Sequence, residues 1–104
     1  MENERRRLAR LPGPFDGRWN GASGGHHCLL TNVNIEGCFI SFIGFETVGA
    51  PVTVIFSSDA GNAIEMPAVV RSVDPGIGFE VQFVEPLDDE RRRLTEWLAK
   101  RGLP

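Results

Sequence analysis

The sequence lacks a long apolar run, and no stretch approaches the ~18 consecutive apolar residues that a membrane-spanning helix requires. Cysteine is scarce, because Cys28 and Cys38 are the only two in the chain, which is too few for a disulfide framework. The first residues are charged where a secretory signal peptide would be apolar. These absences predict a cytoplasmic protein with no membrane partner, in which a reducing environment keeps both cysteines as thiols.

The sequence also lacks the residue groupings that catalysis and metal binding use. His26 and His27 are adjacent and precede Cys28, but neighbours on a strand point to opposite faces and cannot converge on one metal ion. There is no second cluster of histidine and cysteine, and no phosphate-binding loop, nucleophile elbow or carboxylate pair. We therefore predict no enzyme activity, no metal site and no cofactor. One histidine should be half-buried at a strand start, and Cys28 and Cys38 should be small buried side chains.

What the chain does contain is a series of short β-type runs separated by turn signals. In the run "GFEVQFV" the apolar residues alternate with Glu80 and Gln82, which is typical of a strand with one buried face. The expected strands are 26–33, 38–42, 51–57, 64–73 and 78–84, with one short strand near 15–19 in the loop-like, Gly- and Pro-rich stretch 10–25. Five or six antiparallel strands at this spacing predict one small domain, either a barrel or a sandwich.

A helix is expected at about 88–101, after the last strand. Asp88 can cap its start, acidic residues occupy its first turn, basic residues occupy its last turn, and Gly102 can end it. The residues at 91–93 are all arginines, which fan out around a helix and predict a solvated face. The apolar stripe at i, i+3 and i+4 consists of Leu94, Trp97 and Leu98. This stripe should cover one side or end of the sheet, with Trp97 as a core anchor, so the fold is predicted as a β-barrel with a C-terminal helix.

The first ten residues are positively charged, although the whole chain has a formal net charge of −3. Four arginines and two glutamates give residues 1–10 a charge of +2, so residues 11–104 carry −5. The acidic remainder argues against general binding of nucleic-acid polymers. A solubilising tail would explain the arginines alone, but a second pattern further along the chain favours a specific role.

Residues 6–10, "RRLAR", have the form RRxxR, and residues 32–37 read "NVNIEG". In their order and separation these segments resemble the two signature motifs of the PilZ domain family, RxxxR followed by [D/N]xSxxG. A β-type run follows the glycine, and the "GFEVQF" run and the closing helix also lie where that family has them. The resemblance therefore extends over nearly the whole chain.

The resemblance implies an all-β fold with a C-terminal helix, namely a six-stranded antiparallel β-barrel that binds the bacterial second messenger cyclic di-GMP. It implies a flexible arginine-bearing segment at 1–14 and a barrel domain at 15–104. The ligand-binding positions that the match implies are Arg6, Arg7, Arg10, Asn32, Asn34 and Gly37.

Two of these positions leave a question open. Asn34 stands where the family has serine, and a longer, planar amide cannot simply replace a small hydroxyl. Gly37 fits either a turn that needs a positive φ or a close approach of the ligand.

Arginine suits such a ligand on physical grounds, because a guanidinium can form forked bonds to phosphate or to the O6/N7 edge of guanine and can stack on a purine. We therefore expect a single-domain receptor that changes conformation on binding cyclic di-GMP and relays the signal to a protein partner, in processes such as motility or biofilm formation. One alternative is a degenerate PilZ-type adaptor that binds protein partners without nucleotide, which Asn34 favours. Another is a small barrel that binds single-stranded nucleic acid through the basic arm, which the acidic remainder and the lack of tyrosine disfavour.

Overall fold

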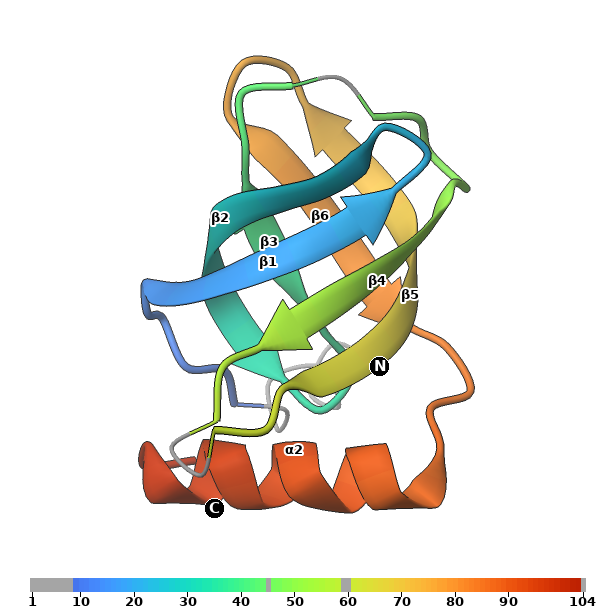
Figure 1. Cartoon of the computed structure of the whole chain (residues 1–104). Coiled ribbons are helices and arrows are strands. Elements are labelled where there is room, and N and C mark those ends of the chain that lie inside the picture. Colours follow the sequence, from blue (N-terminus) through green and yellow to red (C-terminus); the bar gives the residue numbers. More distant parts are fainter. Residues whose placement is uncertain (1–8, 45, 59–60, 104) are drawn as a thin grey trace, which may run out of the picture.

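The computed structural model describes residues 9–44, 46–58 and 61–103. In this part of the chain six antiparallel strands form a closed barrel in the order β1-β2-β3-β6-β5-β4, and the helix α2 (Asp88–Lys100) lies across one end of it (Figure 1). The strands are β1 (Phe15–Gly21), β2 (Gly24–Asn34), β3 (Gly37–Ser41), β4 (Pro51–Phe56), β5 (Ile64–Asp74) and β6 (Gly78–Phe83). The predicted six-stranded antiparallel barrel with a C-terminal helix is thus confirmed.

The glycine-rich stretch near the start is more regular than its composition predicts. It forms the hairpin of β1 and β2, in which Gly21 pairs with Gly24 across a tight turn. A Cβ atom at Gly21 would lie 2.6 Å from the ring of Trp19, a separation that no packed side chain tolerates. Glycine here therefore marks a close contact inside a strand as well as a turn.

Alternating residues of the strands fill the barrel, and α2 closes its lower end in Figure 1. The predicted apolar stripe of the helix is buried, with Leu94 at 0%, Leu98 at 4% and Trp97 at 5% exposure. The Trp97 ring contacts the rings of Phe15 and Phe56, both at 5.1 Å between centroids. Its Nε1–H donates to the carbonyl oxygen of Ser57 over 2.8 Å. Trp97 is therefore a core anchor, as the sequence predicts.

The start of the helix differs from the expectation by one residue. The N-cap is Leu87, whose backbone is extended, and Asp88 is already helical and makes no side-chain cap bond, so the predicted cap at Asp88 is wrong. Acidic residues in the first turn still interact favourably with the helix dipole. At the other end, Gly102 has φ 104° and ends the helix as predicted.

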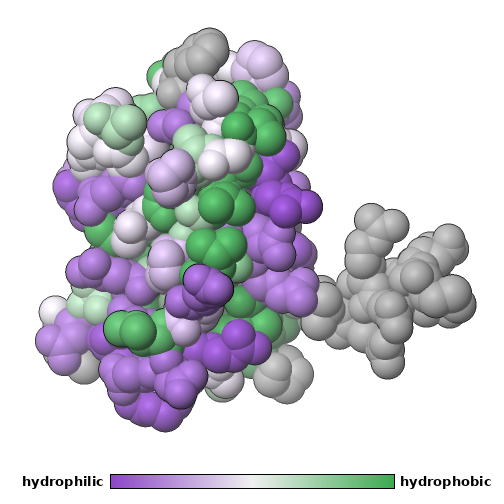
Figure 2. All heavy atoms as spheres, turned by 90° about the vertical axis from the view of Figure 1, so that its right-hand side faces the viewer, coloured by the Kyte–Doolittle hydropathy of each residue, from purple (hydrophilic) through white to green (hydrophobic). Residues whose placement is uncertain are grey.

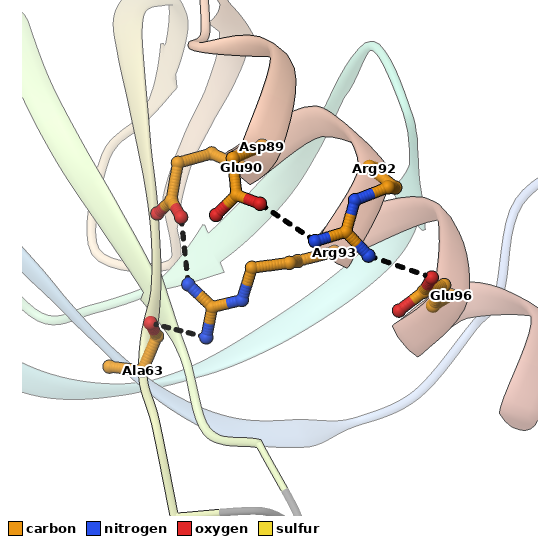
Figure 3. Close-up of polar contacts among 6 residues, drawn as sticks. All are labelled: Ala63, Asp89, Glu90, Arg92, Arg93 and Glu96. Carbon is orange, nitrogen blue, oxygen red and sulfur yellow. Dashed lines mark hydrogen bonds and ion pairs between the residues drawn. The ribbon is translucent and has the colours of Figure 1, made fainter.

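The arginines at 91–93 do not form one patch, and two of them are paired with carboxylates (Figure 3). Arg92 is exposed and bonds Asp89 at 2.7 Å and Glu96 at 3.0 Å, as expected on a solvated face. Arg93 is half-buried, bonds Glu90 at 2.8 Å, and donates to the Ala63 carbonyl at 3.1 Å. Arg93 therefore also ties the helix to the connection before β5, which a purely solvated face would not do.

The histidines and Cys38 lie as expected from their strand positions, whereas Cys28 is less buried than predicted. His26 is half-buried against the rings of Trp19 and Phe42, while His27 is exposed. Cys38 is buried and Cys28 half-buried, both as free thiols; burial raises the pKa of the Cys28 thiol to about 11, against a lowering influence of Arg18. Within the described ranges no three histidine, cysteine or acidic side chains gather as metal ligands, and no helix is long and apolar enough to span a membrane.

The outer surface differs in character from side to side. Figure 2 shows the side that carries β5, where apolar residues form a band between hydrophilic flanks. A shallow hollow of about 410 Å³ is lined here mainly by apolar residues, including Pro51, Pro67, Val69 and Val84. A second hollow, over β2, β3, β6 and β5, is lined by charged and polar side chains together with Phe39 and Val73, and it contains residues of both motifs.

The helix contact yields a direct test of the core. Trp97→Ala should lower the free energy of unfolding by about 3–5 kcal/mol, because it removes a buried ring and leaves a cavity. The control is Ile43→Ala, since the Ile43 side chain is 89% exposed and its loss should change stability by no more than ~0.5 kcal/mol. Urea denaturation measures both. A similar loss in the two variants would contradict the packing of α2 on the barrel.

Candidate functional site

The N-terminal segment is attached to the barrel where β2 extends beyond the start of β1. Leu11 and Val33 exchange two backbone hydrogen bonds, at 2.8 and 2.9 Å. The N–H of Asn32 also donates to the carbonyl of Pro12 at 3.3 Å. Residues 11 and 12 therefore continue the β1 side of the sheet and bring the first motif next to the second.

Asn32 has an unusual backbone conformation that makes this attachment possible. Its φ is 50°, and the register of β2 against β3 shifts between Thr31 and Asn34. A bulge of this kind turns two successive N–H groups to the same side, here toward Leu11 and Pro12. Asparagine tolerates the left-handed region better than most residues, so Asn32 has a backbone role besides any contact with a ligand.

Arg10, the last arginine of the first motif, already contacts the second motif. Its Nη1 donates to the Asn32 carbonyl oxygen at 2.8 Å, and both residues are exposed. This bond takes one of the five N–H donors of a guanidinium. The predicted ligand residues Arg6 and Arg7 lie outside the described residues.

A hollow of about 510 Å³ lies beside this pair on the outer face of the barrel. Its lining consists of Arg10, Asn32, Phe39, Ser72, Val73, Asp74 and Glu80. One wall thus carries a guanidinium and the opposite wall carries two carboxylates, with an aromatic ring between them. The hollow is open to solvent and combines charged, polar and apolar side chains, so it suits a charged ligand that also carries hydrogen-bond donors and a flat apolar face.

Asn34 and Gly37 lie beneath the surface and not in the hollow. Asn34 is 2% exposed, and its Oδ1 accepts the backbone N–H groups of Glu36 at 2.8 Å and Gly37 at 3.2 Å. It therefore holds the turn between β2 and β3. Its Nδ2 is buried without a hydrogen-bond partner among the described residues.

Gly37 is explained neither by a positive φ nor by an approaching ligand, the two reasons that the sequence left open, but by a close contact between strands. Its φ is not positive, and a Cβ atom there would collide with the carbonyl oxygen of Val81 in the neighbouring strand. Glycine is required because β3 and β6 approach closely at this point. Of the six predicted ligand residues, the structure brings Arg10 and Asn32 to the hollow and buries Asn34 and Gly37 at the turn between β2 and β3.

The rest of the hollow was not predicted from the sequence. Phe39, Ser72 and Glu80 belong to three strands, and β3 and β6 become neighbours only through the barrel topology. The alternation of β6 does predict that Glu80 points outward. It does not reveal which side chains stand beside it.

Comparison with known proteins decides the family. The model of the PilZ domain family matches residues 4–100, almost the whole chain. The chain belongs to the PilZ domain family. No curated protein sequence matches it.

Solved structures with the same fold include other PilZ proteins. The PilZ domain of CeSA from a cellulose synthesizing bacterium is 20% identical, with a TM-score of 0.66 over 86% of this chain and 97% of that one. The inhibitor of motility MotI/DgrA of Bacillus subtilis is 20% identical, with a TM-score of 0.73 over 93% and 50%. MrkH of K. pneumonia, in its apo state, is 17% identical, with a TM-score of 0.67 over 89% and 48%. This PilZ chain spans about half the length of the latter two proteins.

The left-handed conformation of Asn32 predicts a difference between two substitutions. Asn32→Ala should destabilise the protein by about 1–2 kcal/mol, because alanine in this region is strained, whereas Asn32→Gly should be close to the unsubstituted protein. Thermal denaturation of both variants measures the difference. If alanine were tolerated as well as glycine, the backbone role of Asn32 would be refuted.

The buried amide of Asn34 gives a second stability test. Asn34→Ala removes the acceptor of two turn N–H groups and should cost about 1–3 kcal/mol. Asn34→Ser should lose less, because a hydroxyl can accept from the same turn and the unpartnered Nδ2 is removed. Urea denaturation distinguishes the two, and equal losses would show that the turn does not depend on the acceptor.

Proposed function

We propose that this chain is a non-enzymatic receptor for cyclic di-GMP that changes conformation on binding and relays the signal to a protein partner. The observation that carries the proposal is the meeting of Arg10 and Asn32, one from each motif, in the lining of a hollow of about 510 Å³. Membership of the PilZ family supports it. The free thiols of Cys28 and Cys38 are consistent with a reducing, cytoplasmic location.

Arg10 provides the first step of the proposed conformational change. In this structure its guanidinium donates to a neutral carbonyl, that of Asn32. A phosphate is a charged acceptor with forked geometry and forms a stronger bond with a guanidinium. Binding would therefore transfer Arg10 from the barrel backbone to the ligand, and Arg6 and Arg7 would join it on the phosphates or guanine faces.

The relay that we propose is a change in the position of the N-terminal segment relative to the barrel. Because Leu11 is bonded to Val33, movement would be centred on the residues before it. Such a change would create or cover surface for a protein partner. Motility and biofilm formation are the processes that we propose for this signal, because the sequence resembles the PilZ family.

One observation favours the second candidate, an adaptor that binds protein partners without nucleotide. Asn34 replaces the serine of the family pattern. Its buried Oδ1 already accepts two backbone N–H groups of the turn and is not turned toward a ligand. The first candidate remains preferred because the arginines of the first motif are present and Arg10 reaches the hollow.

Calorimetric titration with cyclic di-GMP tests the proposal. Arg10→Ala should weaken binding by at least ~10-fold, the loss of one charge-assisted contact of about 1.5–3 kcal/mol. Its melting temperature should barely change, because the side chain is exposed. Arg91→Ala, an exposed arginine on α2 away from the hollow, is the matched control for charge and should bind normally.

Other outcomes would change the conclusion. Equal weakening in the two arginine variants would mean that only net charge matters. If the unsubstituted protein bound no cyclic di-GMP, the adaptor would become the preferred function.

A further inference from the structure

The hollow contains a row of outward-facing side chains that belong to neither motif. Cross-strand register places Thr31 of β2 opposite Phe39, Phe39 opposite Glu80 of β6, and Glu80 opposite Ser72 of β5. Residues directly opposite one another on the same face are close enough to contact. Phe39, Glu80 and Ser72 therefore form one continuous strip across the floor of the hollow and its acidic wall.

Phe39 is held in place by the strand beside it. Its ring lies over Gly78, where a Cβ atom would come within 2.7 Å of the ring. The side chain is half-buried and its remaining surface lines the hollow. An aromatic ring fixed in this way is a suitable surface for a flat base, because bases of any kind stack favourably on aromatic rings.

Glu80 stands next to this ring and its carboxylate is oriented by Ser72. The Ser72 hydroxyl donates to Glu80 Oε1 at 3.3 Å, and Asp74 adds a second carboxylate to the same wall. An ionised carboxylate only accepts hydrogen bonds. Near a dianionic ligand it is unfavourable by repulsion, unless it meets a donor group of that ligand.

Guanine has such donors. Its Watson–Crick edge presents N1–H and the exocyclic N2–H₂ side by side, which a carboxylate can accept together, whereas adenine presents an acceptor at N1. The acidic wall thus suits the base and the guanidinium wall suits the phosphates. The two sides of the hollow thus complement the two charged and polar parts of one ligand, the phosphates and the donor edge of the base.

We propose that Glu80, next to Phe39 in the strand register and bonded by Ser72, binds the Watson–Crick edge of one guanine of cyclic di-GMP while Phe39 stacks on that base. This inference rests on the proposed function and adds the residues that distinguish guanine from other bases.

The test is calorimetry with three ligands: cyclic di-GMP, cyclic di-IMP, which lacks the N2 amine, and cyclic di-AMP. The unsubstituted protein should prefer cyclic di-GMP over cyclic di-IMP by at least ~10-fold, the size of one hydrogen bond to a charged group. In Glu80→Gln, which keeps shape and removes charge, that preference should fall to within about threefold, as expected when the charge-assisted bond is lost. Glu65→Gln, an exposed carboxylate of β5 outside the hollow, is the control and should keep the preference.

Phe39→Leu should weaken binding of all three ligands to a similar degree, because stacking does not depend on the base edge. Its melting temperature serves as the check on folding.

Each contrary result has a distinct meaning. If Glu80→Gln bound cyclic di-GMP as tightly as the unsubstituted protein, or more tightly, while Arg10→Ala lost binding, the guanine subsite would be refuted and the receptor function retained. If the unsubstituted protein bound none of the three ligands, the proposed function and the subsite would both be refuted.

Discussion

The backbone bridge between Leu11 and Val33 is the contact on which the arrangement of the site depends. It has two hydrogen bonds of 2.8 and 2.9 Å, and it anchors the N-terminal segment directly after Arg10. Without it, the first motif would be held to the barrel only by the single bonds that Asn32 makes with Pro12 and with Arg10. The bridge in turn requires the bulge at Asn32, whose positive φ turns the N–H groups of β2 toward that segment. A backbone irregularity therefore brings the two motifs together.

This arrangement separates two kinds of residue within one sequence pattern. Arg10 and Asn32 lie at the surface, where they can meet a ligand. Asn34 and Gly37 lie below, where one holds the turn and the other permits β3 to approach β6. The replacement of serine by asparagine at position 34 thus falls on a buried residue that holds the turn between β2 and β3. Its effect on a ligand would be transmitted through the position of the turn, which is 34–37.

The sequence predicts the architecture well because each element carries its own local signal. Alternation gives the strands, and the spacing of Leu94, Trp97 and Leu98 gives the buried face of the helix. The site is harder to predict, because its walls come from strands that are distant in the chain. Phe39 and Glu80 are 41 positions apart in the sequence but lie directly opposite each other in the sheet. No local sequence pattern predicts that pairing. The prediction of Asp88 as the N-cap was wrong by one residue. Leu87 has the extended backbone of an N-cap although it makes no side-chain cap bond.

The closure of the barrel has a consequence for recognition. Because β4 pairs with β1 to complete the ring, the six described strands leave no open edge along the sheet onto which a foreign strand could be added. Another polypeptide cannot bind this barrel by extending its hydrogen-bond ladder, the commonest backbone-based route to association and aggregation. A partner must instead bind to side chains on the barrel surface, to the turns or to the helix. Selectivity for a partner is then encoded in the surface residues, which can diverge between relatives while the barrel beneath them stays the same.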